Sequence, residues 1–273
     1  MSAASTSPSL TLGPFPVDAP KRVWPNYFRL VPNDLLQGDF AANYAFGRGG
    51  FRTAATVNDR DLYGQGLVTT FERRWRLLGA EITSSRSVAE DEPRLPAVAA
   101  AIARERPQVV YFGGQGTAAI QLASRLRGAG YDGQIMGGDA ITSSDFIRKV
   151  RGADGTLATT VGGRIDTGSP QVKRFTAAYQ AAFGNDGYTL IGPITYDAGT
   201  LVIQAVAAAM RGASGVAAAR PGVVRALAAT RDFKGITGTY GFDEFGDTTR
   251  RTLTVNQVSG GGWKPVRSGP LGQ

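Results

Sequence analysis

The segment "FRTAATVNDRDLYGQGLVTTFERRWRLLG", residues 51–79, decides the fold because it joins a strand pattern to a helix pattern. Its first part, residues 51–57, is an apolar run typical of a strand. Its second part repeats large apolar side chains at helical spacing: Leu67, Phe71, Trp75 and Leu78. This spacing predicts a helix over residues 65–78.

Two glycines, Gly64 and Gly66, lie just before and just after the predicted start of this helix. A Gly-rich turn at the start of a helix leaves backbone N–H groups free to meet a negative group of a ligand. An ordinary tight loop would use the same residues. The segment alone leaves both interpretations open.

The same rhythm continues outward from this segment, between about residues 34 and 162. Helix patterns occupy residues 34–46, 65–78, 95–106 and 117–130, and strand patterns occupy residues 51–57, 81–88, 108–114 and 134–139. Such alternation predicts an α/β fold with a parallel sheet of at least four strands, covered by helices on both faces. Ligands bind beyond the carboxyl ends of such strands, so we expect Tyr63, Gln115 and Asp139 at one edge of the sheet.

Composition excludes several kinds of site. The chain of 273 residues contains no cysteine and no histidine. A Ser/His/Asp triad, a thiolate nucleophile and the usual zinc site therefore each lack an essential member. The formal net charge is +8, but the arginines are scattered through predicted helices without an aromatic-basic repeat. This distribution favours a solvated surface over a nucleic-acid partner.

A dinucleotide site is the main alternative to a simple binding pocket. "GQGTAA", residues 114–119, has the G-x-G-x-x-A form, follows a predicted strand and opens a predicted helix. Asp139 follows at the next strand end, where an acid for a ribose would lie. Against this interpretation, the fingerprint normally occupies the first βα turn of its domain, and here two strands precede it. An NAD-dependent oxidoreductase therefore stays as the alternative.

The second half of the chain is dominated by helices. Residues 169–184 and 196–210 have helical apolar patterns, and a third helix is expected to start near Pro221, because proline suits a first turn. Residues 235–266 read as short strands broken by turns. The acids Asp243, Glu244 and Asp247 lack the spacing of an EF-hand and are expected to lie in a solvated turn.

The apolar runs predict no transmembrane segment, and the N-terminal residues do not have the pattern of a signal peptide. The longest strongly apolar run, residues 200–210, is short of the ~20 residues that a crossing needs. The first twenty residues are polar and Pro-rich, without the basic start and apolar centre of a signal peptide.

Seven motifs, in this order and spacing, carry a family resemblance. They are "YFRLVPND" (27–34), "YGQGL" (63–67), "VVYFGG" (109–114), "MGGD" (136–139), "ITYDAGTLVIQAV" (194–206), "FKGITGTYGFDEFGD" (233–247) and "VNQVSGGGW" (255–263). The chain resembles, over nearly its whole length, the leucine/isoleucine/valine-binding protein family, the type I periplasmic solute-binding proteins of ABC importers.

The resemblance implies a two-lobed fold with a ligand cleft and a hinge. The second, C-terminal lobe would comprise residues 30–162 plus 248–268, and the first, N-terminal lobe residues 1–29 plus 163–247. Compared with the family, about a hundred residues of the first lobe are not in this sequence, including a serine turn that shares the ligand carboxylate. Without the sheet that those residues would supply, we expect the helices at 170–183 and 196–211 to keep exposed apolar faces.

The resemblance also implies the ligand contacts. Ala4 through its backbone and Thr6 through its hydroxyl and N–H would hold the carboxylate of an amino acid, and Asp139 would pair with its ammonium. Tyr63 would face the ligand. Gln115 stands where branched-chain binders tend to place an aromatic residue, which weakens the case for an aliphatic pocket.

Each of these residues also has a simpler interpretation. Asp139 could cap the following turn, Tyr63 could serve packing alone, and Thr6 could be a solvated loop residue.

The implied function is that of an extracytoplasmic receptor, periplasmic or at the cell surface. It would deliver an amino acid or related solute to a membrane permease, without catalysis, cofactor or metal. A ligand-sensing lobe of a regulator would need an output domain, and no such domain is visible in the sequence.

Overall fold

The computed structural model describes residues 1–13, 19–89, 92–184, 191–211 and 213–270. The predicted lobes also include positions that lie outside the described residues: 14–18, 90–91, 185–190 and 212. The chain divides into two compact units. Unit 1 comprises Met1–Asn33 and Gly162–Arg251, and unit 2 comprises Asp34–Val161 and Thr252–Gln273.

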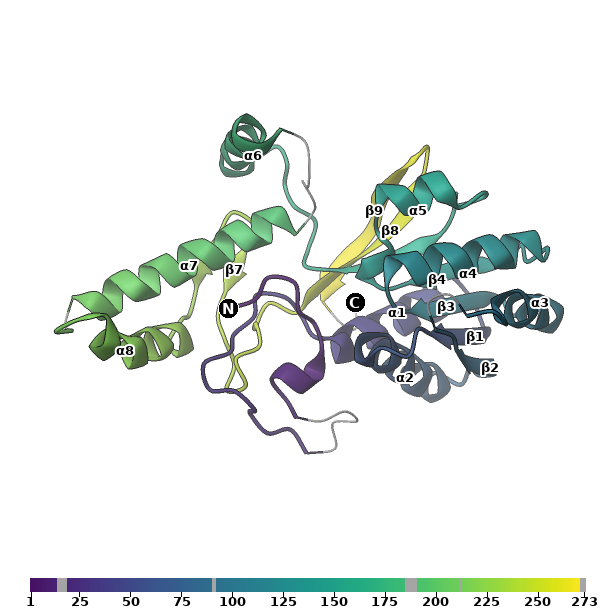
Figure 1. Cartoon of the computed structure of the whole chain (residues 1–273), viewed down its shortest axis with the longest axis horizontal. Helices are drawn as coiled ribbons and strands as arrows, with labels where there is room; N and C mark the ends of the chain where they lie inside the picture. Colours follow the sequence, from purple (N-terminus) through teal and green to yellow (C-terminus); the bar gives the residue numbers. More distant parts are fainter. Residues whose placement is uncertain (14–18, 90–91, 185–190, 212, 271–273) are drawn as a thin grey trace. The chain divides into compact units, whose positions relative to one another are not determined.

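Unit 2 is built on one seven-stranded sheet (Figure 1). Its strand order is β2 (Glu81–Ser87), β1 (Thr53–Asn58), β3 (Val109–Gly113), β4 (Gln134–Gly137), β5 (Leu157–Val161), β8 (Thr252–Ser259) and β9 (Gly262–Pro270). The first five strands run parallel, and β8 and β9 are antiparallel additions. The prediction of a parallel sheet of at least four strands is confirmed.

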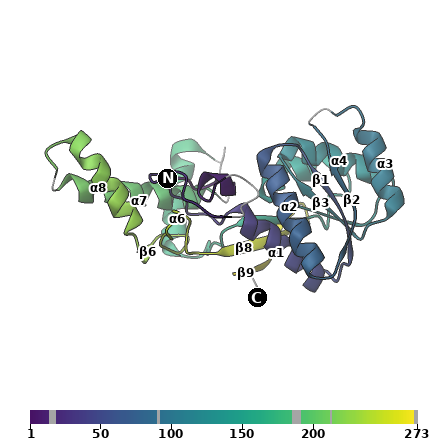
Figure 2. The same cartoon turned by 90° about the horizontal axis from the view of Figure 1, so that it is seen from below.

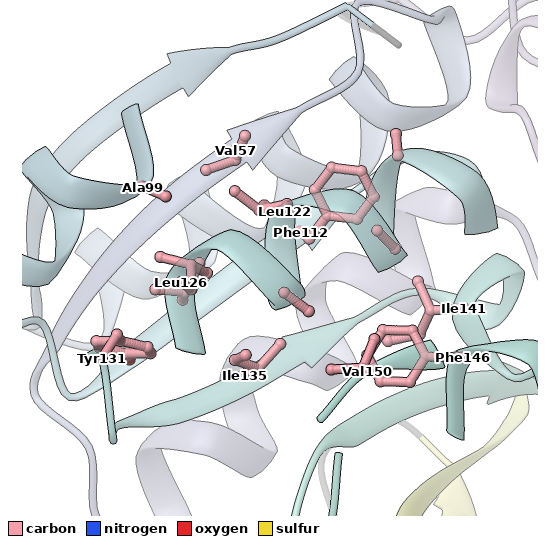
Figure 3. Packing of buried hydrophobic residues seen from close by; sticks show 14 of the residues in the cluster. Val57, Ala99, Phe112, Leu122, Leu126, Tyr131, Ile135, Ile141, Phe146 and Val150 are labelled. Atoms are coloured by element: carbon pink, nitrogen blue, oxygen red, sulfur yellow. The ribbon is translucent and has the colours of Figure 1, made fainter. Parts of the chain in front are cut away.

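The helices of unit 2 cover both faces of this sheet, as expected (Figure 2). They are α1 (Asp34–Gly47), α2 (Leu62–Leu77), α3 (Leu95–Glu105), α4 (Gly116–Gly128), the 3-10 turn η2 (Asp139–Ile141) and α5 (Ser144–Lys149). On one face, Val110 and Phe112 of β3 join the apolar core beneath α3, α4 and α5 (Figure 3). On the other face, Tyr111 stacks on Phe71 of α2 with ring centroids 4.0 Å apart. Adjacent residues of β3 thus point to opposite cores, as strand geometry requires.

Helix α2 begins three residues earlier than the pattern predicted. The side chain of Asp61 accepts a hydrogen bond from the Tyr63 N–H and caps the helix. Gly64 and Gly66 therefore lie inside α2 and not in a turn. A Cβ at Gly64 would lie 2.5 Å from the Gly113 carbonyl oxygen, so glycine is needed there for close contact between α2 and the end of β3.

Unit 1 contains η1 (Pro8–Leu10), three longer helices and a two-stranded sheet. These elements are α6 (Pro170–Phe183), α7 (Gly192–Met210), α8 (Val216–Ala228), β6 (Phe233–Lys234) and β7 (Thr239–Tyr240). Helix α8 starts before Pro221 and contains it, so the prediction that Pro221 opens this helix is wrong. The preceding residues 216–220 are Ala-rich, and their helix propensity extends the helix backward.

Buried polar contacts hold unit 1 together. The guanidinium of Arg29, which is fully buried, donates to Asp247 Oδ1 at 2.6 Å. It also donates to the carbonyl oxygens of Ser5 (3.2 Å) and Ser7 (2.8 Å). Asp247 is 7% exposed, so the expectation of a solvated turn is wrong for this residue, because its carboxylate neutralises a buried arginine.

A second carboxylate, Asp197 of α7, organises the loop between β6 and β7. It accepts hydrogen bonds from the backbone N–H groups of Ile236 (2.7 Å) and Thr237 (2.9 Å). A Cβ at Gly235 would lie 2.3 Å from the Asp197 carboxylate, so this close approach requires glycine. The loop is therefore fixed to α7 by a buried charged side chain.

Candidate functional site

The carboxyl ends of β1, β3 and β4 meet at one edge of the unit 2 sheet. Tyr63 lies in the first turn of α2 after β1, Gln115 follows β3, and Asp139 follows β4. The prediction that these three residues share the carboxyl edge of the sheet is confirmed.

Asp139 is the centre of a hydrogen-bonded cluster at this edge. Its Oδ1 accepts hydrogen bonds from the Tyr63 hydroxyl at 2.8 Å and from Gln37 Nε2 of α1 at 2.9 Å. Gln37 Nε2 also donates to Thr159 Oγ1 of β5 at 3.1 Å. Two neutral donors from two different helices thus fix the orientation of one carboxylate.

The second oxygen of this carboxylate is available. Among the described residues, no group donates a hydrogen bond to Asp139 Oδ2, and the residue is partly exposed. Asp139 does not act as a helix cap, because α5 is capped by Ser143, whose hydroxyl accepts from the Phe146 N–H at 3.1 Å. An oriented, partly exposed carboxylate with one open oxygen can accept hydrogen bonds from a cationic group.

Tyr63 of this cluster and Tyr111 of β3 stay protonated. Burial, followed by the negative charges of Asp139 and Asp34, raises the pKa of Tyr63 well above its usual value. Burial also raises the pKa of Tyr111, with Asp34 and Asp139 adding to the effect. Tyr63 therefore remains a hydrogen-bond donor to Asp139 at physiological pH, and packing alone does not describe it.

A glycine makes room for this arrangement. A Cβ at Gly138 would lie 2.5 Å from the Tyr63 hydroxyl oxygen. Any side chain at this position would displace the ring and break its bond to Asp139. The "GGD" of the sequence thus serves the geometry of the carboxylate.

Gln115 lies at the same edge but outside the Asp139 cluster. It is the N-cap residue of α4, and its side chain is exposed. Its backbone N–H donates to Asp59 Oδ2 at 2.7 Å. The Asp59 carboxylate therefore already accepts a hydrogen bond from an N–H group that would face a dinucleotide phosphate at "GQGTAA". This contact counts against the dinucleotide alternative.

The other two predicted residues belong to unit 1. Ala4 is exposed, and its backbone N–H donates to Ser2 Oγ at 3.3 Å. Thr6 is 4% exposed, so it is not a solvated loop residue. Arg29 fixes this segment by holding the carbonyl groups on either side of Thr6.

Sequence reasoning missed Gln37, Thr159 and Arg29. The signal available for Gln37 was its place in "DLLQGDF", where polar residues interrupt the apolar pattern at the start of a predicted helix. Arg29 stood inside one of the family motifs, but nothing in the sequence distinguished it from a surface arginine. Among the described residues, no group of three or more acidic, His or Cys side chains could hold a metal ion.

Similarity to solved structures shows the class of fold. The structure superimposes on that of a leucine-binding protein from Thermotoga maritima MSB8 with a TM-score of 0.82, at 22% identity, covering 98% of this chain and 72% of that one. It also matches a branched-chain amino acid transporter substrate-binding protein from Streptococcus pneumoniae, solved with isoleucine. That match has a TM-score of 0.73 at 21% identity and covers 88% of this chain and 66% of that one. The fold is that of type I periplasmic binding proteins.

The family follows from the sequence match. A model described as "Periplasmic binding protein" matches residues 3–262, and the chain belongs to this family. A leucine-, isoleucine-, valine-, threonine- and alanine-binding protein of Pseudomonas aeruginosa is 26% identical over 230 residues, covering 84% of this chain and 59% of its own length. The chain thus spans somewhat more than half the length of this relative, and the resemblance to the Leu/Ile/Val-binding proteins is confirmed.

None of the helices that the structure describes is both long and apolar enough to cross a bilayer.

Proposed function

We propose that this chain is an extracytoplasmic solute-binding component of an ABC importer that binds a branched-chain or related amino acid. It would pass this ligand to a membrane permease without any catalytic step. The family match over residues 3–262 and the names of the relatives support the role. The bound isoleucine of the pneumococcal protein supports the ligand class.

The domain assignment is part of this proposal. Unit 2 would correspond to the second lobe, predicted as residues 30–162 plus 248–268. Unit 1 would correspond to the first lobe, predicted as residues 1–29 plus 163–247. Proteins of this architecture close around a ligand by hinge motion.

The observation that carries the proposal is the carboxylate of Asp139. Gln37 and Tyr63 orient it through Oδ1 and leave Oδ2 open. Neither of these donors is charged, so the negative charge of Asp139 is not neutralised by them. An ammonium group supplies both the missing charge and the missing hydrogen bond.

The remaining contacts are proposed on the resemblance. The Ala4 backbone and the Thr6 hydroxyl and N–H would hold the ligand carboxylate. The Tyr63 ring would face the ligand, and the exposed Gln115 side chain would lie close to the ligand's own side chain. A polar residue in that position favours a solute with a short or partly polar side chain.

Calorimetry with L-leucine tests the ammonium contact. The Asp139→Asn variant should bind about ten- to a hundred-fold more weakly, because a charge-assisted hydrogen bond contributes about 1.5–3 kcal/mol. Asp132→Asn is the matched control, since Asp132 is exposed and precedes β4 whereas Asp139 follows it. The control variant should bind leucine as the wild type does.

Two results would overturn the proposal. Equal leucine affinities for the wild type and Asp139→Asn would remove Asp139 from the site. Saturable NADH fluorescence without any heat from amino acids would favour the dinucleotide alternative. The Tyr63→Phe variant refines the test, because it keeps the ring and removes only the donor to Asp139, so a smaller loss of affinity is expected than for Asp139→Asn.

A further inference from the structure

A hollow of about 430 Å³ lies on unit 2, outside the Asp139 cluster. Its walls come from the second half of α1, the last turn of α2 and strand β9, and include Phe40, Asn43, Tyr44, Arg48, Arg74 and Arg267. This volume falls within the range of small-molecule sites, roughly 300–1,000 Å³.

The hollow is separate from the carboxylate site, although α1 contributes to both. Gln37, which holds Asp139, and Arg48 are eleven positions apart in the sequence. This separation corresponds to roughly 16 Å along a helix axis. The positions of α1 that line the hollow besides Phe40 are three, four and seven residues after it, which is one continuous helix face, and Arg48 directly follows the end of α1.

Three guanidinium groups line this hollow, and no acid does. Arg74 donates Nε–H to Asn43 Oδ1 at 2.8 Å. The side chains of Arg48 and Arg267 make no hydrogen bond or ion pair with any residue that the structure describes. Their donors are therefore available to a ligand.

The acid near the hollow is already engaged. Asp39 lies close enough to Arg74 to feel its charge. Its carboxylate, however, accepts two hydrogen bonds from Arg73 Nη2, at 2.8 and 3.0 Å. Asp39 and Arg73 offset each other, which leaves Arg48, Arg74 and Arg267 as an excess of positive charge. Such a surface of one sign, set in a concave wall, concentrates anions.

The walls also provide apolar contact. Phe40 is 3% exposed, and Tyr44 is partly buried. Burial raises the pKa of Tyr44, although the charge of Arg48 opposes this, so its hydroxyl stays protonated and can donate. Planar guanidinium forks match carboxylate and phosphate oxygens in a two-pronged geometry.

We propose that this hollow binds a small organic anion with at least two negative groups, of the polycarboxylate or phosphate-ester class. The anion would lie between Arg48 and Arg267, with Arg74 held in place by Asn43. The proposal is independent of amino-acid binding at Asp139.

Calorimetry with citrate and, separately, with fructose 1,6-bisphosphate tests the site and distinguishes the polycarboxylate class from the phosphate-ester class. The wild type should bind one of them saturably, with one site per chain, and more weakly as salt is raised. The Arg48→Gln/Arg267→Gln double variant should bind at least tenfold more weakly. Its leucine affinity and melting temperature should be unchanged, because these side chains contact no described residue through hydrogen bonds or ion pairs.

The matched control is Arg104→Gln/Arg151→Gln. It removes the same two charges from exposed positions of unit 2, outside the hollow. Equal weakening in the control would show that net charge alone attracts the anion, and would overturn the proposal. Absence of saturable binding of both probes to the wild type would also overturn it, and would favour an acidic macromolecular surface as the partner of this face.

Discussion

Helices α2 and α7 each bury an apolar stripe, which in α7 includes Ile194 and Leu201, but α7 carries further large apolar side chains outside its stripe. In unit 2, Phe71 and Trp75 of α2 are fully buried. In unit 1, the longer helix α7 leaves Ile203 70% exposed and Val206 41% exposed. Helix α2 packs against the broad sheet at Tyr111, whereas the strands described in unit 1, β6 and β7, have two residues each. A helical apolar pattern therefore predicts a helix with one buried stripe, but whether apolar side chains outside that stripe are also covered depends on surfaces elsewhere in the chain.

The two units consequently rely on different interactions. Unit 2 is held by apolar side chains packed on both faces of a sheet. Unit 1 combines buried apolar side chains, such as Phe28 and Phe242 with ring centroids 5.0 Å apart, with buried polar contacts: the Arg29–Asp247 pair and the bonds from the 236–237 backbone to Asp197. The proposed ammonium acceptor, Asp139, stands on the unit with the larger apolar core. A site on a rigid sheet edge keeps its geometry better than one on a loosely packed element.

The same substitution should have a large effect on stability at a buried position of unit 2 and a small effect at an exposed position of unit 1. Phe71→Ala removes a ring stacked on both Tyr111 and Trp75, and we expect it to lower the free energy of unfolding by about 3–5 kcal/mol. Phe183→Ala, at a position of α6 that is 67% exposed, should change it by less than about 0.5 kcal/mol. Urea unfolding followed by circular dichroism measures the difference, because both units contain helices. Equal effects would contradict the comparison.

Arg29→Met should destabilise unit 1 without affecting unit 2. It leaves the Asp247 carboxylate buried without its cation, at a cost of up to about 3–5 kcal/mol. Circular dichroism should show an early loss of helix, while the fluorescence of Trp75 and Trp263 in unit 2, measured in a Trp24→Phe background, keeps its wild-type midpoint in urea. Adding Asp247→Asn should recover part of the loss, because the buried charge is then removed as well. A double variant as unstable as the single one would show that the pair does not hold unit 1 together.

Ile203→Gln should have little effect on the free energy of unfolding but should clearly reduce aggregation. Ile203 is 70% exposed, so its replacement should alter the free energy of unfolding by less than about 0.5 kcal/mol. Light scattering on warming should nevertheless show less aggregation than for the wild type, because an exposed apolar side chain is removed. A matched change in unit 2, Leu77→Gln, tests whether the effect is specific to α7, since Leu77 is 68% exposed. If both variants reduce aggregation equally, exposed apolar side chains of both units contribute to it, and the effect is not specific to α7.

Much of unit 2 was predictable because each part of its pattern has a local cause. The strand–helix alternation predicted four of the five parallel strands and the shared edge of Tyr63, Gln115 and Asp139. The fifth strand, β5, was not singled out, because its five residues follow the Gly-rich segment 152–156 and resemble a loop continuation. The earlier start of α2 was also missed, since the cap by Asp61 overrides the helix-breaking tendency of Gly64 and Gly66.

The hydrogen bonds of the site were less predictable. Gln37 reaches Asp139 across about a hundred residues of chain, and its role depends on how α1 packs over β5. The burial of Arg29 and Asp247 likewise depends on two segments more than two hundred residues apart. Polar contacts of this kind leave no periodic signal, whereas apolar stripes do.

Hydrogen exchange of the 273-residue chain, with and without L-leucine, tests the central claim most directly. Without ligand, amides of β1, β3 and β4 should exchange slowly and those of α6 and α8 much faster, because protection follows the local density of buried contacts. Leucine should add protection to residues 59–66 and 137–142, which surround Tyr63 and Asp139, and Asp139→Asn should abolish this addition. The account is contradicted if α6 and α8 are protected as strongly as β1 and β3 before ligand is added, or if leucine protects neither of those two segments.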